Sequence, residues 1–101
     1  MPRMNKLSNY ATTVGYKNGN TTVTYHSTPI VEFDHECIIL RTGGWKSVTT
    51  KRKMNQAARQ FDLGYSVMQK DHAWFVRYDF SHQGLNTVKA FDGDEMVIKR
   101  A

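Results

Sequence analysis

The chain has 101 residues, of which 40% are hydrophobic, so it has room for one small domain with one core. Fourteen Lys and Arg against nine Asp and Glu give a net charge of +5, which makes anionic partners reasonable candidates without requiring them. The single cysteine, Cys37, excludes an intramolecular disulfide, and no apolar run is long enough for a membrane span or a signal peptide. We therefore expect one domain over residues 1–101, located in the cytoplasm.

The first predicted elements are two strands, ATTVGY and TTVTY, which flank residues 17–20. The turn between them contains Asn18 and Gly19, a strong hairpin signal because both residues tolerate positive φ. Both strands carry Thr-Thr-Val-x-Tyr, so we expect Thr and Tyr side chains to form a ladder across the pair.

The segment TPIVEFDHECIILR predicts two further strands joined at Asp34-His35, with Val31 and Phe33 on one face. Residues 37–40 form a continuous apolar run, which is typical of a central strand covered on both faces. We expect Cys37 to be a buried, unreactive side chain there.

Histidine and cysteine could also indicate chemistry. His35 and Cys37 would share a strand face, but no C-x-x-C or H-x-x-x-H accompanies them, so we expect no zinc site. A ribonuclease-type pair of His26 with Tyr25 or Tyr65 is not selected by any sequence feature. The chain is thus expected to be non-enzymatic, without catalytic residues, metal or cofactor.

The period changes at Lys51, where apolar residues recur at the spacing of one helix face: Met54, Ala57, Ala58 and Phe61. Thr49 or Thr50 can supply the N-cap oxygen, and Gly64 is placed to end the helix. The sequence therefore predicts a helix of about three turns.

Two more pairs of strands are predicted after the helix. GYSVMQ and AWFVRYDF flank residues 70–72, and Trp74 and Val76 alternate with Phe75 and Arg77. NTVKAF and EMVIK around Asp92-Gly93 predict a last hairpin, with a charged tip rather than a calcium loop. The sum is an α+β domain, with one amphipathic helix packed on a mostly antiparallel sheet of about six or seven strands built from hairpins.

The segment from Arg41 to Phe61 contains six basic residues and no carboxylate. A helix with the apolar face above exposes Arg52, Asn55, Gln56 and Arg59, side-chain types that bind phosphates and base edges. Cations in the first helical turn oppose the helix dipole, yet with the free backbone N–H groups they describe an anion site. The predicted nucleic-acid-binding residues are Arg41, Lys46, Lys51, Arg52, Lys53, Asn55, Gln56 and Arg59.

Simpler explanations exist for the same residues. A charged helix face often serves only solubility. Gly43 and Gly44 would let backbone approach a ligand closely or would simply form a turn, and Trp45 is expected in the core rather than stacked on a base. No P-loop pattern is present, so nucleotide hydrolysis of that kind is not indicated.

Three stretches, TYHSTPIV, LRTGGWKSVTTKRKMNQAARQFDLGYSVMQ and WFV, resemble small proteins of unknown function encoded in tailed-bacteriophage genomes. The resemblance covers residues 22–78. It implies a setting, the cytoplasm of an infected bacterium, where such proteins often bind a host or phage macromolecule. It implies no activity, cofactor or catalytic residue.

Two functions fit these observations. The preferred hypothesis is a DNA- or RNA-binding module in which the helix lies along a phosphate backbone. The alternative is an inhibitor or adaptor that binds a host or phage protein through its basic face or a sheet edge. A homodimer paired through sheet edges is compatible with either, and no membrane contact is expected.

Overall fold

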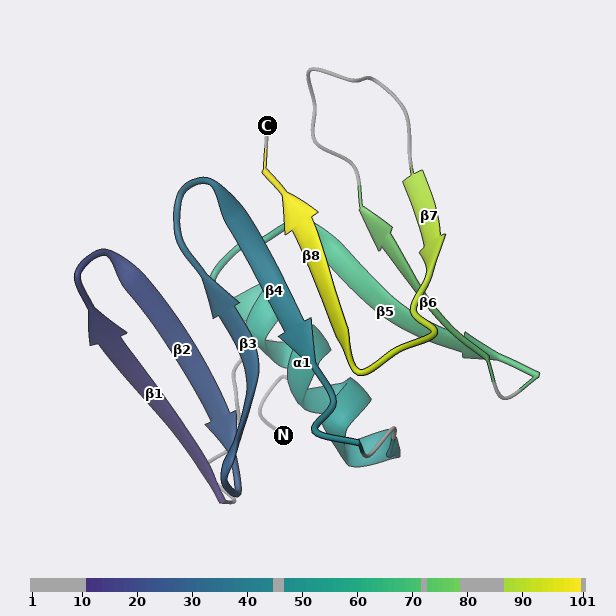
Figure 1. The fold of residues 1–101 in the computed structure, drawn as a ribbon, viewed down its shortest axis with the longest axis horizontal. Helices are drawn as coiled ribbons and strands as arrows, with labels where there is room; N and C mark the ends of the chain where they lie inside the picture. Colours follow the sequence, from purple (N-terminus) through teal and green to yellow (C-terminus); the bar gives the residue numbers. More distant parts are fainter. Residues whose placement is uncertain (1–10, 45–46, 72, 79–86, 101) are drawn as a thin grey trace, which may run out of the picture.

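The structure, a computed structural model, describes residues 11–44, 47–71, 73–78 and 87–100. Its described part contains one helix and eight strands, arranged as a five-stranded sheet in the order β1-β2-β3-β4-β8 and a three-stranded sheet in the order β5-β6-β7 (Figure 1). All paired strands are antiparallel. The elements are β1 (Thr12–Lys17), β2 (Asn20–Tyr25), β3 (Thr28–Phe33), β4 (Cys37–Arg41), α1 (Val48–Gln60), β5 (Tyr65–Lys70), β6 (Ala73–Tyr78), β7 (Thr87–Ala90) and β8 (Glu95–Lys99).

The α+β prediction is confirmed, and so are the first three of the four predicted hairpins. Asn18 and Gly19 both adopt positive φ, 52° and 80°, between β1 and β2. Tyr16 lies opposite Thr21 and Thr12 opposite Tyr25, so the expected Thr and Tyr ladder forms. The turn between β3 and β4 is also where it was predicted.

One irregularity helps to fill the core. The pairing of β2 with β3 shifts after Val23, so that Ile30 and Val31 both lie near Val23 and both are buried. A β-bulge of this kind turns two successive side chains toward the same side of a sheet.

Strand β4 is central, as predicted, because it lies between β3 and β8. It is not covered on both faces: Ile38 and Leu40 are buried, whereas Cys37 and Ile39 are only partly buried. The prediction of a buried Cys37 is therefore wrong. One face of the five-stranded sheet packs on the core, and the other, which carries Cys37 and Ile39, we call the open face.

Helix α1 begins and ends differently from the prediction. Ser47, not Thr49 or Thr50, is the N-cap, and its hydroxyl accepts a hydrogen bond from the Thr50 N–H at 3.1 Å. At the other end Asp62 adopts φ 54°, and the Leu63 N–H donates to the Ala58 carbonyl at 2.9 Å. This is a Schellman end whose left-handed position is Asp62, and Gly64, with φ 79°, adopts positive φ two residues later.

The predicted last hairpin is wrong. The strands β7 and β8 exist, but β7 pairs with β6 while β8 pairs with β4 in the other sheet. Between them Phe91 is buried, packs edge-to-face on Trp74 and donates its N–H to the Trp74 carbonyl at 2.8 Å. Burial of Phe91 holds the chain where it crosses from one sheet to the other.

The core lies between the five-stranded sheet and a second layer formed by α1 and the three-stranded sheet. From the helix, Met54, Ala57 and Ala58 are buried as predicted, and Phe61 packs partly buried against them. Trp45, which was expected in the core, lies outside the described residues. The buried apolar side chains are Val23, Ile30, Val31, Ile38, Leu40, Met54, Ala57, Ala58, Leu63, Tyr65, Val67, Trp74, Val76, Phe91 and Ile98.

Candidate nucleic-acid interface

The basic residues of α1 do not surround its N-terminus. The helix begins at Val48, and Lys51 closes the first turn by donating its N–H to the Ser47 carbonyl at 3.1 Å. Arg52 and Lys53 therefore belong to the second turn. The prediction of three cations around the free N–H groups assumed that Thr49 or Thr50 is the N-cap. Because Ser47 is the N-cap, the helix begins about one turn earlier than predicted.

Two predicted binding residues of the helix are buried: Lys53, expected at an anion site in the first turn, and Gln56, expected on the solvent side. Lys53 and Gln56 are each 3% exposed. The Lys53 ammonium lies 5.2 Å from the centre of the Tyr25 ring, and burial lowers the pKa of this lysine. The prediction that Gln56 is exposed is wrong, since it assumed a helix covered on one side only.

The Asn55 side chain is hydrogen-bonded to the backbone of β5. Its side-chain amide donates to the Val67 carbonyl at 3.0 Å and accepts from the Val67 N–H at 2.7 Å. Strand β5 is the edge of its sheet, so Asn55 takes the place of a neighbouring strand there. Its amide is therefore not available to pair with an adenine, contrary to the role predicted for it.

Arg41 lies on the open face of the five-stranded sheet, away from the helix. Its guanidinium donates to Glu32 at 2.8 Å and to Glu95 at 3.0 Å. These contacts raise the pKa of Arg41, and the bond from Arg41, helped by Asn20, lowers the pKa of Glu32. Two carboxylates neutralise this cation, so it does not extend the basic surface of α1.

The Glu32 contacts predict a pH dependence of stability. Because the pKa of Glu32 is lowered by folding, its stabilising effect is complete above the ordinary value of 4.5 and is lost as pH falls through the lower folded-state pKa. We expect Glu32→Gln to lose about 1 kcal/mol of unfolding free energy at neutral pH and less at acidic pH. Urea denaturation at both pH values measures this difference, and an equal loss at both would contradict it.

The predicted residues of α1 that are exposed or only partly buried form a narrow stripe along the helix. Arg52 and Arg59 are exposed, Lys51 is partly buried with its ammonium 3.4 Å from the Gln69 side-chain oxygen, and Asn55 lies between the arginines. Lys46, the remaining predicted residue, lies outside the described part of the chain. Gly43, considered for close approach to a ligand, approaches the protein itself: a Cβ there would lie 2.7 Å from the Thr28 side chain.

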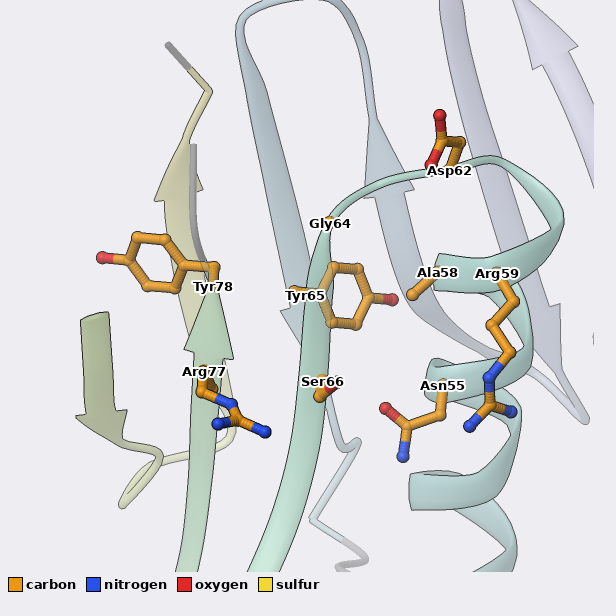
Figure 2. A pocket seen from close by; sticks show the side chains of 9 residues that line it. All are labelled: Asn55, Ala58, Arg59, Asp62, Gly64, Tyr65, Ser66, Arg77 and Tyr78. Atoms are coloured by element: carbon orange, nitrogen blue, oxygen red, sulfur yellow. The ribbon is translucent and has the colours of Figure 1, made fainter. Parts of the chain in front are cut away.

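The structure brings Arg59 together with a residue that was not predicted, Arg77. Both line a pocket of 410 Å³ between α1, β5 and β6. Figure 2 shows Arg59 extending from the helix toward Asn55, and Arg77 extending from β6 toward Ser66 on β5. The pocket is lined by Asn55, Ala58, Arg59, Asp62, Gly64, Tyr65, Ser66, Arg77 and Tyr78.

The pocket has the charge balance of an anion site. Its described lining contains two arginines and one carboxylate, Asp62, which is exposed. The Arg77 guanidinium has no hydrogen-bond or ion-pair partner among the described residues. Alternation along β6 identifies Arg77 as outward-facing from sequence alone, because its neighbour Val76 is apolar. Its place in the same pocket as Arg59 depends on how the sheet that begins with β5 and β6 packs beside the helix.

No other chemistry is apparent in the described part of the chain. Among those residues, no three His, Cys, Asp or Glu side chains are grouped closely enough to hold a metal ion. No helix there is long and apolar enough to cross a membrane.

Most of the chain matches a known protein-family model. A family model described as Kyanoviridae Gp96 protein matches residues 2–97, well beyond the stretches that first indicated phage proteins. No curated protein and no solved structure matches the chain.

Proposed function

The chain belongs to the Kyanoviridae Gp96 protein family of cyanophages, and from this premise we propose that it is a non-enzymatic nucleic-acid-binding protein of the infected host's cytoplasm. The family confirms the predicted resemblance to phage-encoded proteins. Binding of nucleic acid is supported by one observation above all, the two arginines that line one pocket from separate elements.

Arginine suits this role because its planar guanidinium donates two parallel hydrogen bonds to a phosphate. In this proposal a backbone phosphate group lies in the pocket of 410 Å³, which Arg59 lines from the helix and Arg77 from β6. Arg52 lies two turns before Arg59 on the same exposed stripe, about 10 Å away along the helix axis. It would contact a second phosphate of the same strand. We call Arg52, Arg59 and Arg77 together the arginine track.

The arginine track replaces the nucleic-acid-binding surface that the sequence predicted. Of the predicted residues, Lys51, Arg52 and Arg59 remain in the proposal, and Arg77 with Ser66 joins them. Lys53, Asn55 and Gln56 support the fold instead, and Arg41 is neutralised on the open face.

The direct test compares two double variants with the same loss of charge. Arg59→Ala/Arg77→Ala removes the pocket arginines, and Lys17→Ala/Lys99→Ala removes two exposed lysines elsewhere, at the end of β1 and on β8. Fluorescence anisotropy with labelled DNA and RNA, over a series of salt concentrations, gives the affinity and its salt dependence. We expect the arginine variant to bind about 10- to 100-fold more weakly and the lysine variant to bind nearly as the wild type does.

The salt series adds an independent criterion. Each lost phosphate contact lowers the slope of log affinity against log salt by about 1, so the arginine variant should lose about 2. Equal effects in both variants would mean that net charge alone attracts nucleic acid. Absence of binding in the wild type would reject the proposal and direct attention to an acidic protein surface as the partner.

A further inference from the structure

The outer face of the three-stranded sheet continues directly from the proposed phosphate pocket. Strand register places Ser66, Arg77 and Val88 in one row across the sheet, and Met68, Phe75 and Ala90 in the next. These side chains point away from the face that buries Val67, Trp74 and Val76.

This face is open to solvent. Ser66, Arg77 and Ala90 are exposed, and Val88 is 55% exposed. Phe75, partly buried, is the aromatic residue of the two rows. Its neighbour Ala90 on β7 and Ala73 two positions before it on β6 are small, so few side-chain atoms flank the ring on those two sides.

Phe75 and Arg77 are two positions apart on β6 and share this face, about 6.6–6.8 Å from one another along the strand. An aromatic ring beside a phosphate-binding arginine is the arrangement with which proteins hold unpaired nucleotides: the base stacks on the ring and the backbone pairs with the cation. Bases in a duplex are stacked on one another and do not present their faces in this way.

The surroundings of the helix argue against a duplex as well. A helix that reads a major groove must protrude from its domain so that several side chains reach the base edges. Here β5 flanks α1 through Asn55, and Lys53 and Gln56 are buried, which leaves only a narrow exposed stripe.

We infer that this protein binds single-stranded nucleic acid, with a base stacked on Phe75 and the adjoining phosphates held by Arg77 and Arg59. The inference rests on the proposed function and adds the class of nucleic acid and the residue that contacts the base. Stacking on a phenylalanine discriminates little between bases, so binding should tolerate changes of sequence.

The test measures anisotropy with single strands of about 15 nucleotides and with duplexes of the same length, for the wild type and three variants. Phe75→Leu keeps an apolar side chain but removes the ring, and we expect it to bind single strands roughly 5- to 50-fold more weakly. Phe75→Trp keeps a ring and should bind as the wild type does, with tryptophan fluorescence quenched by added strand. Tyr16→Leu removes an aromatic ring that is 72% exposed on β1 and should leave affinity unchanged.

The outcomes separate this inference from the proposed function. Equal affinity for duplexes and single strands, or unchanged single-strand binding by Phe75→Leu while Arg59→Ala/Arg77→Ala binds weakly, would overturn the inference and leave the proposed function standing. Weak binding by both the Leu and the Trp variants, with thermal melting unchanged, would also overturn it. If the wild type bound neither single strands nor duplexes, both the inference and the proposed function would be rejected.

Discussion

Asn55→Ala is expected to lower the free energy of unfolding by about 2–4 kcal/mol, a large effect for one polar residue on a helix. The wild-type amide pairs with both the N–H and the carbonyl of Val67, at 2.7 and 3.0 Å. Alanine would leave two backbone groups of an edge strand without these partners in a partly buried place. Each unsatisfied group of this kind costs about 1–3 kcal/mol.

Urea denaturation followed by circular dichroism measures this loss. Arg52→Ala, an exposed substitution one turn earlier on the same helix, is the matched control and should change stability by no more than about 0.5 kcal/mol. Asn55→Asp keeps an acceptor for the Val67 N–H but loses the donor, so its stability should fall between those of the wild type and Asn55→Ala. If Asn55→Ala were as stable as the control, the side chain would not be holding β5.

The same contact matters for the proposed site. Asn55 joins α1 to β5 in the pocket that Arg59 and Arg77 also line. Any Asn55→Ala protein that remains folded should therefore bind nucleic acid more weakly than the wild type, although this side chain is not proposed to contact the ligand.

Trp74→Ala is expected to cost about 3–5 kcal/mol, a substantial fraction of the roughly 5–15 kcal/mol that stabilises a small domain. Trp74 is 2% exposed, and its ring meets the ring of Phe91 edge-to-face with centres 6.1 Å apart. Removing the indole leaves a large cavity and deprives Phe91 of its neighbour. Because Phe91 stands where the chain crosses between sheets, the loss weakens the attachment of β8 as well as the core.

Thermal and urea unfolding of Trp74→Ala and Trp74→Phe test this expectation. Phenylalanine preserves an aromatic contact with Phe91, so the second variant should be clearly more stable than the first. Val97→Ala, at a position 58% exposed on the open face, is the control for shortening a strand side chain without making a cavity. Similar losses in Trp74→Ala and the control would contradict a core role for the tryptophan.

Local signals account for what the sequence predicted correctly. Asn18-Gly19 specified its turn because few residue pairs adopt two positive φ values without strain. Alternation identified the buried side of β6, with Trp74 and Val76 inside and Arg77 outside, because successive side chains on a strand face opposite ways. These patterns depend on neighbours along the chain and need no knowledge of distant contacts.

Apart from the misplaced helix start, the errors at β8 and Asn55 come from contacts between segments far apart in sequence. A short loop at Asp92-Gly93 suggested a hairpin, but β8 instead completes the edge beside β4, with Leu40 opposite Met96. The helix pattern predicts that Asn55 faces solvent, whereas β5 packs beside it and its Val67 backbone groups bond the Asn55 side chain.

The sequence by itself determined an α+β domain with one amphipathic helix, most of its hairpins, the inward faces of its strands and an excess of positive charge. Only the tertiary structure decided where the cations lie: Lys53 is buried, Arg41 is neutralised by Glu32 and Glu95, and Arg59 and Arg77 line the same pocket. The physical reason is that periodicity reports which way a side chain points, whereas burial and charge pairing depend on what the fold places opposite it.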